Sequence, residues 1–215
     1  MRTKIEQQKQ LIQMVSMIED KFILSSRVRE AFLNIPRDIF IPQGMLHIAY
    51  KLDALPLGTR QFISSPLTVA KMTQYLELES CDSILEVGLG SGYQAAILSK
   101  IVRRVFSIER INRLRDEAIE RFRLLNIMNV NTKLDDGKNG WDRFAPFDRI
   151  LFSASLKEIP LRIISQLCNG GIIVAPILKD DGSQVITRFI KHNDMLEILD
   201  MKDNCSFVIV RDNIE

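Results

Sequence analysis

A short apolar run followed by three glycines at alternate positions constrains this chain more than any other feature. Residues 83–87 read Ser-Ile-Leu-Glu-Val, and Gly88, Gly90 and Gly92 follow before a helical pattern begins at Tyr93. An apolar run bounded by polar residues is typical of a central strand in a parallel sheet. Glycine lets a ligand approach the main chain closely, and the helix N-terminus behind it offers free N–H groups. The stretch therefore predicts a ligand-binding turn between a buried strand and a helix.

The spacing of these glycines distinguishes between classes of cofactor. A dinucleotide-binding turn requires glycine at its first, third and sixth positions. Counted from Gly88, the sixth position is Tyr93, which argues against NAD or FAD. Glycine at positions one, three and five, with Glu86 two residues ahead, resembles motif I of the S-adenosylmethionine-dependent methyltransferases. The alternative is a glycine-rich turn of the kind found in any α/β protein.

Acidic residues follow the next two predicted strands. Residues 104–109 end in Glu109, and a carboxylate at the end of a second strand suits a ribose, because it can accept from both hydroxyls. Asp136, followed by Gly137, lies in the loop after the third strand, where an acid can accept from the amine of an adenine. The alternatives are a capping or surface role for Glu109 and a plain turn at residues 135–137.

Strand and helix patterns alternate from residue 83 to residue 176. The expected strands are 83–87, 104–108, 130–134, 147–152 and 172–176, and the expected helices are 93–100, 113–125 and 161–167. After a turn at 179–182, residues 184–191, 196–201 and 206–210 read as further strands, the first two forming an antiparallel hairpin. This order predicts an α/β fold with a doubly wound sheet, mostly parallel with antiparallel strands at the C-terminal end. Together with the resemblance of the glycine turn to motif I, it implies a Rossmann-like methyltransferase sheet.

Helical periodicity within residues 1–22 and a second helix over residues 28–34 predict an N-terminal helical extension. Prolines hold residues 36–42 out of regular structure, and residues 54–58 read as another irregular piece. No linker divides the chain, so we expect a single methyltransferase domain over residues 1–215. Within it, residues 1–80 form the helices and a covering segment, and residues 81–215 form the cofactor-binding core.

The second informative stretch is residues 61–70. Pro66 suits the first position of a helix that extends to about Leu76, and Ser65 suits its N-cap. Ser64 then lies just before a helix N-terminus, where a hydroxyl beside free N–H groups suits a carboxylate ligand. The alternative is that Ser64 and Ser65 are merely capping residues.

Charge and composition exclude several classes of binding partner and site. The formal net charge is +2, and no block of like charges or long apolar run occurs, so we expect no nucleic-acid or membrane partner. The three cysteines and two histidines are widely spaced, which predicts reduced thiols and no metal site. The N-terminal residues lack a secretory apolar region, so we expect a cytoplasmic protein.

Several blocks give the chain a more specific resemblance to the bacterial protein-L-isoaspartate O-methyltransferases. The blocks similar to that family are Pro36-Arg37-Asp38-Ile39-Phe40-Ile41-Pro42, Leu55-Pro56-Leu57-Gly58, Gln61-Phe62-Ile63-Ser64-Ser65-Pro66, residues 86–96, Val105-Phe106-Ser107-Ile108-Glu109-Arg110, Asp136-Gly137 with Gly140-Trp141, and residues 145–150. The glycine turn alone indicates only a methyltransferase. The block at residues 61–66 makes the resemblance specific.

The resemblance implies both an activity and a site. Members methylate the α-carboxylate of L-isoaspartyl residues in damaged proteins with S-adenosyl-L-methionine, which starts repair through a succinimide. The resemblance places the active-site serine at Ser64. It places the cofactor contacts at Gln61, Phe62, Ile63, Ser64, Glu86, Gly88, Leu89, Gly90, Ser91, Gly92, Glu109, Arg110, Asp136 and Gly137. The expected partners are proteins or peptides carrying isoaspartyl residues, and the chain is expected to be a monomer or weak homodimer.

The chain departs from the family at a few positions. Arg60 stands where the family usually has glycine, and Phe62 where it has threonine. Residues 153–156 replace a more alanine-rich stretch, and Ile209 replaces a proline. Arg60 and Phe62 flank the expected substrate site. Two alternatives therefore stay open: a diverged methyltransferase with another substrate, and a cofactor-binding protein without catalysis.

Overall fold

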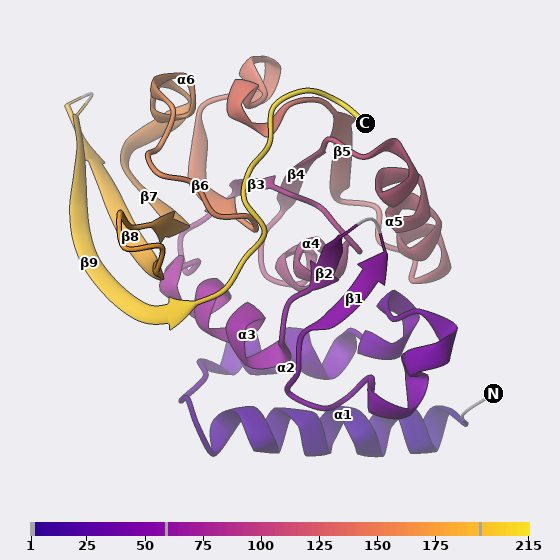
Figure 1. The fold of residues 1–215 in the computed structure, drawn as a ribbon. Helices are drawn as coiled ribbons and strands as arrows, with labels where there is room; N and C mark the ends of the chain where they lie inside the picture. The colour runs from indigo at the N-terminus through magenta and orange to yellow at the C-terminus, as the bar shows by residue number, and fades with distance from the viewer. Residues whose placement is uncertain (1–2, 59, 194) are drawn as a thin grey trace.

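The centre of the molecule is a seven-stranded sheet with the strand order β5-β4-β3-β6-β7-β8-β9. The structure is a computed structural model that describes residues 3–58, 60–193 and 195–215. The neighbouring strands from β5 to β7 are parallel, whereas β8 and β9 are antiparallel additions at one end (Figure 1). The predicted fold class, a mostly parallel sheet with antiparallel C-terminal strands and an N-terminal helical extension, is confirmed.

The strands of this sheet are β3 (Ser83–Val87), β4 (Arg104–Glu109), β5 (Val130–Leu134), β6 (Phe147–Phe152), β7 (Leu167–Leu178), β8 (Gln184–His192) and β9 (Met195–Cys205). A separate hairpin consists of β1 (Leu55–Gly58) and β2 (Gln61–Ile63). The α-helices are α1 (Lys4–Glu19), α2 (Ser26–Asn34), α3 (Pro66–Tyr75), α4 (Tyr93–Ser99), α5 (Asn112–Leu124) and α6 (Leu161–Ser165). The 3₁₀ turns are η1 (Arg37–Phe40), η2 (Gln43–Ile48), η3 (Gly137–Asn139) and η4 (Asp142–Phe144).

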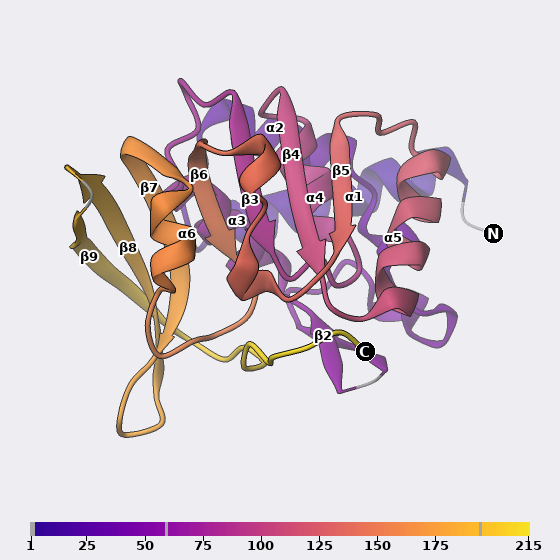
Figure 2. The same ribbon diagram turned by 90° about the horizontal axis from the view of Figure 1, so that it is seen from above.

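Side chains alternate between the two faces of the central strands. Ile84 and Val105 pack in one core cluster with residues from α1–α4, whereas Leu85 and Phe106 pack in a second cluster with Ile163 of α6. Figure 2 shows the corresponding layers, with α2 and α4 on one side of the sheet and α6 on the other. Because both faces are covered, β3 has buried apolar residues on both of its faces, Ile84 on one and Leu85 and Val87 on the other. The one polar interior residue of β3, Glu86, belongs to the site described below.

Capping residues that are visible in the sequence mark the start of α1, α2 and α3. Thr3 and Glu6 form a reciprocal capping box at the start of α1, and Ser25 caps α2. Ser65 caps α3, with Pro66 as its first residue. The predicted cap at Ser65 is confirmed.

The segment before α3 is more regular than the prolines suggested. Residues 36–42, expected to be irregular, contain the 3₁₀ turn η1, and a second 3₁₀ turn follows directly. Residues 55–58, also expected to be irregular, form β1 of the hairpin. Proline is compatible with both, because it suits a 3₁₀ turn entry and the edge of a two-stranded sheet.

Two predictions for the C-terminal third are wrong. The helix expected over residues 161–167 ends at Ser165, and the strand expected over residues 172–176 already begins at Leu167 as β7. Residues 206–210 are not a further strand of the sheet. Cys205 pairs with Gln184, the first residue of β8, so the ladder with β8 stops there, and the residues beyond make an isolated parallel bridge between Ile209 and Ser155 instead.

The segment after β9 instead crosses the carboxyl ends of the central strands (Figure 1). Gln184 holds its start, accepting from the N–H of Phe207 at 2.7 Å and donating to its carbonyl at 3.0 Å. Further on, the N–H groups of Ser155 and Val210 donate to the carbonyls of Val208 and Ser155, both at 2.8 Å. These contacts place residues 207–211 above the glycine turn.

Candidate active site

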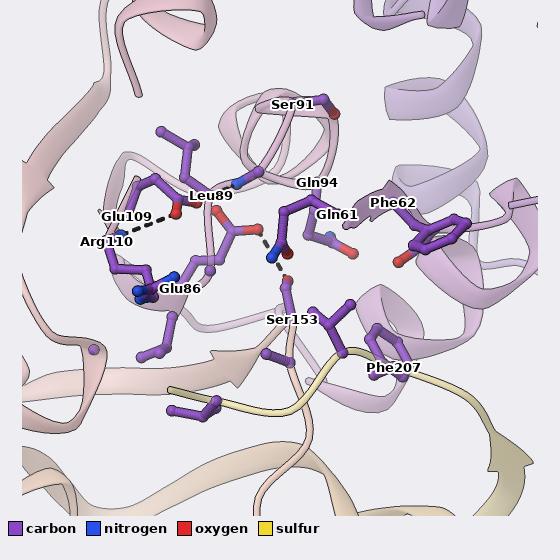
Figure 3. Close-up of a pocket in the computed structure, with 18 of the residues that line it drawn as sticks. Gln61, Phe62, Glu86, Leu89, Ser91, Gln94, Glu109, Arg110, Ser153 and Phe207 are labelled. Atoms are coloured by element: carbon purple, nitrogen blue, oxygen red, sulfur yellow. Dashed lines mark hydrogen bonds between the residues drawn. The ribbon is translucent and has the colours of Figure 1, made fainter. Parts of the chain in front are cut away.

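A cavity opens where the carboxyl ends of β3, β4 and β6 meet, the usual ligand position in an open α/β sheet. Its walls come from segments far apart in the sequence: residues 61–64, 86–91, 108–111, 153–154 and 207–211. Two residues of α3 (Val69 and Met72), two of α4 (Tyr93 and Gln94) and Gly137 complete the lining. Figure 3 shows the labelled side chains converging from these elements.

Most of the predicted site residues meet at this cavity. Those that line it are Gln61, Phe62, Ile63, Ser64, Glu86, Gly88, Leu89, Gly90, Ser91, Glu109, Arg110 and Gly137. Gly92 and Asp136 are not among its lining residues. Gly92 is the N-cap of α4 with φ 86°, and a Cβ there would lie 2.9 Å from the ring of Phe122, so the turn leaves no room for a side chain at this position, and the cofactor contact of Gly92 stays a prediction. Asp136 accepts from the N–H groups of Lys138 and Asn213, at 2.9 and 3.3 Å, and its adenine contact stays a prediction.

The glycine turn presents main chain to the cavity. Gly88 and Gly90 have φ values of 98° and 53°, a region that side-chain-bearing residues rarely adopt. The N–H groups of Gly88 and Leu89 donate to the carbonyl of Ile108 at 2.9 and 3.1 Å, which ties the turn to β4. A Cβ at Gly90 would meet nothing within 4 Å. The turn is therefore rigidly held while its backbone stays open to a ligand.

Glu109 closes one side of the cavity and organises the turn. Its carboxylate accepts from the N–H of Gly90 at 2.7 Å and from the N–H groups of Arg110 and Ile111 at 2.9 and 3.0 Å. Figure 3 shows the bond to Arg110. Burial raises the pKa of Glu109, and the three N–H donors oppose that shift. An acceptor-only group is thus held at the cavity wall, where it suits a diol.

Glu86 is the second buried acid of the site. Its side chain is wholly buried, and the hydroxyls of Ser107 and Ser153 donate to its two oxygens at 2.5 and 3.2 Å. Burial raises the pKa of Glu86 to about 8, and the charge of Glu109 adds to the shift. Near neutral pH the protein without ligand therefore holds Glu86 largely protonated.

The raised pKa of Glu86 predicts a pH dependence of stability. The unfolded chain releases this proton near pH 4.5 and the folded chain near pH 8, so between them only the folded chain binds it. The stabilisation is complete below pH 4.5 and is lost as pH rises through 8, at up to about 1.4 kcal/mol per pH unit. We expect Glu86→Gln to remove this slope, because the amide stays neutral and can still bond both serine hydroxyls.

Urea unfolding of wild type and Glu86→Gln at several pH values from 4.5 to 8.5 measures this difference. Glu79→Gln, at an exposed acid just before β3, is the matched control and should keep the wild-type slope. Parallel curves for wild type and Glu86→Gln would contradict the assignment of the proton to Glu86.

Ser64 lies in the cavity wall between β2 and the start of α3. The hydroxyl that caps α3 belongs to Ser65, which bonds the N–H of Thr68 at 3.1 Å. The carbonyl of Ser64 accepts from the guanidinium of Arg37 at 3.2 Å, which holds its backbone from behind. The capping alternative therefore applies to Ser65, and the hydroxyl of Ser64 is left for another role.

Several lining residues were missed by the sequence reasoning. Ser153 follows β6 at the carboxyl edge of the sheet, a position that does signal a site residue. Gln94 lies in the first turn of α4, where its amide donates to the hydroxyl of Thr73 at 2.9 Å. Residues 207–211 are not among the predicted site residues, because the apolar pattern of residues 206–210 favours a strand of the sheet. These five residues cover the cavity on the side opposite the glycine turn.

Over residues 3–58, 60–193 and 195–215, three or more His, Cys, Asp or Glu side chains never gather closely enough to hold a metal ion. Within the same residues, each helix is too short or too polar to cross a bilayer.

Comparison with known proteins agrees with this site. The sequence profile of the protein-L-isoaspartate(D-aspartate) O-methyltransferase family matches residues 6–215. A protein-L-isoaspartate O-methyltransferase of Helicobacter pylori is 52% identical over 198 residues, covering 92% of this chain and 94% of its own length. One from Dictyoglomus thermophilum is 44% identical over 181 residues, covering 84% and 82%.

Solved structures show the same fold. A protein-L-isoaspartate O-methyltransferase superposes with a TM-score of 0.87 at 28% identity, covering 95% of this chain and 67% of its own. A putative member from Plasmodium falciparum, in complex with S-adenosyl-L-homocysteine, has a TM-score of 0.82 at 22% identity, covering 96% and 99%. The profile match spans nearly the whole chain, and the resemblance noted at residues 61–66 and 86–96 lies within it. The chain belongs to the protein-L-isoaspartate(D-aspartate) O-methyltransferase family.

Proposed function

We infer that this chain is a protein-L-isoaspartate O-methyltransferase that uses S-adenosyl-L-methionine. It methylates the α-carboxylate of L-isoaspartyl residues in damaged proteins, and the ester then collapses to a succinimide that reopens in part to normal aspartate. One observation above all supports this function: residues 61–64 and 86–91, which both resemble sequence blocks of the family, line the same cavity. Family membership over residues 6–215 supports it.

The residues of the cavity fit this cofactor. Gly90 leaves open backbone, Glu109 offers carboxylate oxygens to a ribose, and Gln61 adds an amide. Arg110 lines the same wall. When bound, S-adenosyl-L-methionine supplies an electrophilic methyl group on a sulfonium. The chain's task is then to place an acceptor in line with that methyl and to exclude water.

The acceptor needs no general base. A carboxylate is already ionised at neutral pH and is a nucleophile in that form. This agrees with a cavity whose lining residues include no histidine. Ser64, beside the N-terminus of α3, is suited to hold the substrate carboxylate or its backbone by a hydrogen bond. Phe62 and the segment around Phe207 provide apolar cover against water.

Transfer of labelled methyl to an isoaspartyl peptide tests this function. The same peptide with a normal aspartyl residue is the control, and the label must be base-labile, as a carboxyl methyl ester is. Label on the isoaspartyl peptide alone is the expected result. Bound cofactor without any transfer would instead favour a diverged substrate, which the departures at Arg60 and Phe62 raise, or a non-catalytic role.

Ser64→Ala tests the proposed active-site serine. One hydrogen bond to a charged substrate group contributes about 1.5–3 kcal/mol, so kcat/KM for the isoaspartyl peptide should fall about tenfold to a hundredfold. The Kd for S-adenosyl-L-homocysteine should change little. Ser65→Ala is the matched control, because loss of the α3 cap should cost about 1 kcal/mol of stability while most activity remains. Equal losses of activity in the two variants would assign both serines to capping.

We also propose the domain organisation, location and oligomeric state that the sequence predicts. One domain over residues 1–215 is supported by the core cluster that α1–α3 share with the sheet. A cytoplasmic location is supported by three free cysteines. We keep the monomer or weak homodimer as the proposed state.

A further inference from the structure

A second hollow adjoins the cavity on the side of the hairpin turn. It shares Gln61, Arg110, Phe207 and Arg211 with the cavity, so the two form one continuous depression. The hollow lies between the turn that joins β1 to β2 and the segment after β9. A peptide whose modified residue enters the cavity near Ser64 therefore has this hollow beside its neighbouring residues.

The charged lining of the hollow is mostly positive. Arg60, Arg110 and Arg211 face one acid, Glu215, which leaves an excess of two positive charges. Arg110 is already engaged, donating to the side chain of Glu215 and the carbonyl of Asn213, both at 2.9 Å. Within the described residues, neither Arg60 nor Arg211 has an ion pair or side-chain hydrogen bond. Both are exposed and free to meet an anionic ligand.

The backbone conformation of Arg60 also supports a role in binding an anionic ligand. Its φ is 56°, a left-handed conformation that costs a side-chain-bearing residue about 1 kcal/mol. Glycine, the usual residue of the resembling proteins here, would adopt it without that cost. Arg113 lies behind the turn, with its guanidinium 3.7 Å from the Cβ position of Gly58, and is paired with Glu117. Arg60, which has no ion pair within the described residues, is thus held in a turn that lies beside a second guanidinium, that of Arg113.

We propose that this hollow binds acidic side chains that flank the isoaspartyl residue, so that Arg60 and Arg211 set a preference for acidic peptides. The proposal rests on the proposed function for the position of the peptide. Exposed ion pairs contribute about 0.2–1 kcal/mol each, so two of them change affinity by about twofold to thirtyfold. Such pairs weaken as salt rises.

Three isoaspartyl peptides, identical except for Glu, Gln or Lys on both sides of the isoaspartate, test the preference. We expect KM to be lowest for the Glu peptide and highest for the Lys peptide, with a smaller spread at high salt. Arg60→Gly with Arg211→Gln should reduce the spread in KM to within about twofold. Arg123→Gln removes an exposed arginine at the far end of α5 and should keep the full spread.

Binding of the same labelled peptides by fluorescence anisotropy, with S-adenosyl-L-homocysteine present, measures the hollow without turnover. Equal binding of the three peptides, or a spread that the double variant keeps, would overturn the proposal. Charge-dependent binding with no methyl transfer to any peptide would overturn the proposed function and leave the hollow as an acidic-peptide site.

Discussion

Arg37→Met is expected to lower the free energy of unfolding by about 3–5 kcal/mol, the largest stability effect predicted for this chain. The Arg37 side chain is wholly buried, and its guanidinium donates to the carbonyls of Ala49 (2.5 Å), Lys51 (3.2 Å), Asp53 (2.9 Å) and Ser64 (3.2 Å). Burial lowers its pKa. The five donors of a guanidinium let one side chain hold four carbonyls, three within residues 49–53 and one at Ser64, just before α3.

The physical reason for the large effect is the set of acceptors left behind. Methionine fills much of the volume but donates nothing, and each unsatisfied buried polar group costs about 1–3 kcal/mol. The guanidinium also lies 5.9 Å from the ring centroid of Tyr93, a contact that is lost as well. Part of the cost is recovered as water reaches the outer carbonyls. Because Ser64 is among the four residues, the variant should also lose activity at temperatures where it remains folded.

Urea unfolding followed by circular dichroism measures this loss. Arg29→Met, the same change at an exposed arginine of α2 paired with Glu19, is the matched control and should cost less than about 1 kcal/mol. Arg37→Lys should lie between the two, because an ammonium keeps the charge but cannot reach four acceptors. If the two methionine variants were equally stable, the guanidinium would not be what holds these turns.

Glu109→Gln is expected to weaken binding of S-adenosyl-L-methionine by about thirtyfold to a hundredfold. The carboxylate accepts from the N–H groups of Gly90, Arg110 and Ile111, and an amide would turn a donor toward one of these donors. Charge-assisted bonds contribute about 1.5–3 kcal/mol each, and the same oxygens are the proposed partners of the ribose. The variant therefore disturbs both the glycine turn and the diol contact.

Isothermal titration with S-adenosyl-L-methionine and S-adenosyl-L-homocysteine measures the affinity. Both ligands should lose affinity by a similar factor, because they share the ribose and differ only at the methyl group. Glu120→Gln makes the same change at an acid of α5 whose side chain is 69% exposed, and should bind like wild type. Wild-type affinity in Glu109→Gln would rule out a ribose contact at this carboxylate.

The sequence alone determined the features that depend on neighbours along the chain. The buried β3, the glycine turn and the Ser65–Pro66 helix start all follow from short-range patterns of apolar residues, glycines and caps. The alternation of strands and helices then predicted a parallel sheet, and its carboxyl edge brought Glu86, Gly88 and Glu109 together as expected. The resemblance to a known family added Gln61 as a site residue. It also favoured an active-site role for Ser64, for which the local pattern alone left both capping and ligand binding open.

Only the tertiary structure decided the features whose partners lie far apart in the sequence. Residues 206–210 have an apolar pattern that suits a strand, but the ladder between β8 and β9 stops where Cys205 pairs with Gln184, the first residue of β8, so residues 207–211 cover the cavity instead. The sequence also did not predict the four carbonyls that accept from Arg37 or the hydrogen bond from the N–H of Gly90 to Glu109. Every residue carries the same backbone carbonyl, and nearly every residue the same N–H, so no letter of the sequence marks which of them a buried side chain will bond. That choice is made only when the packed elements bring them within reach.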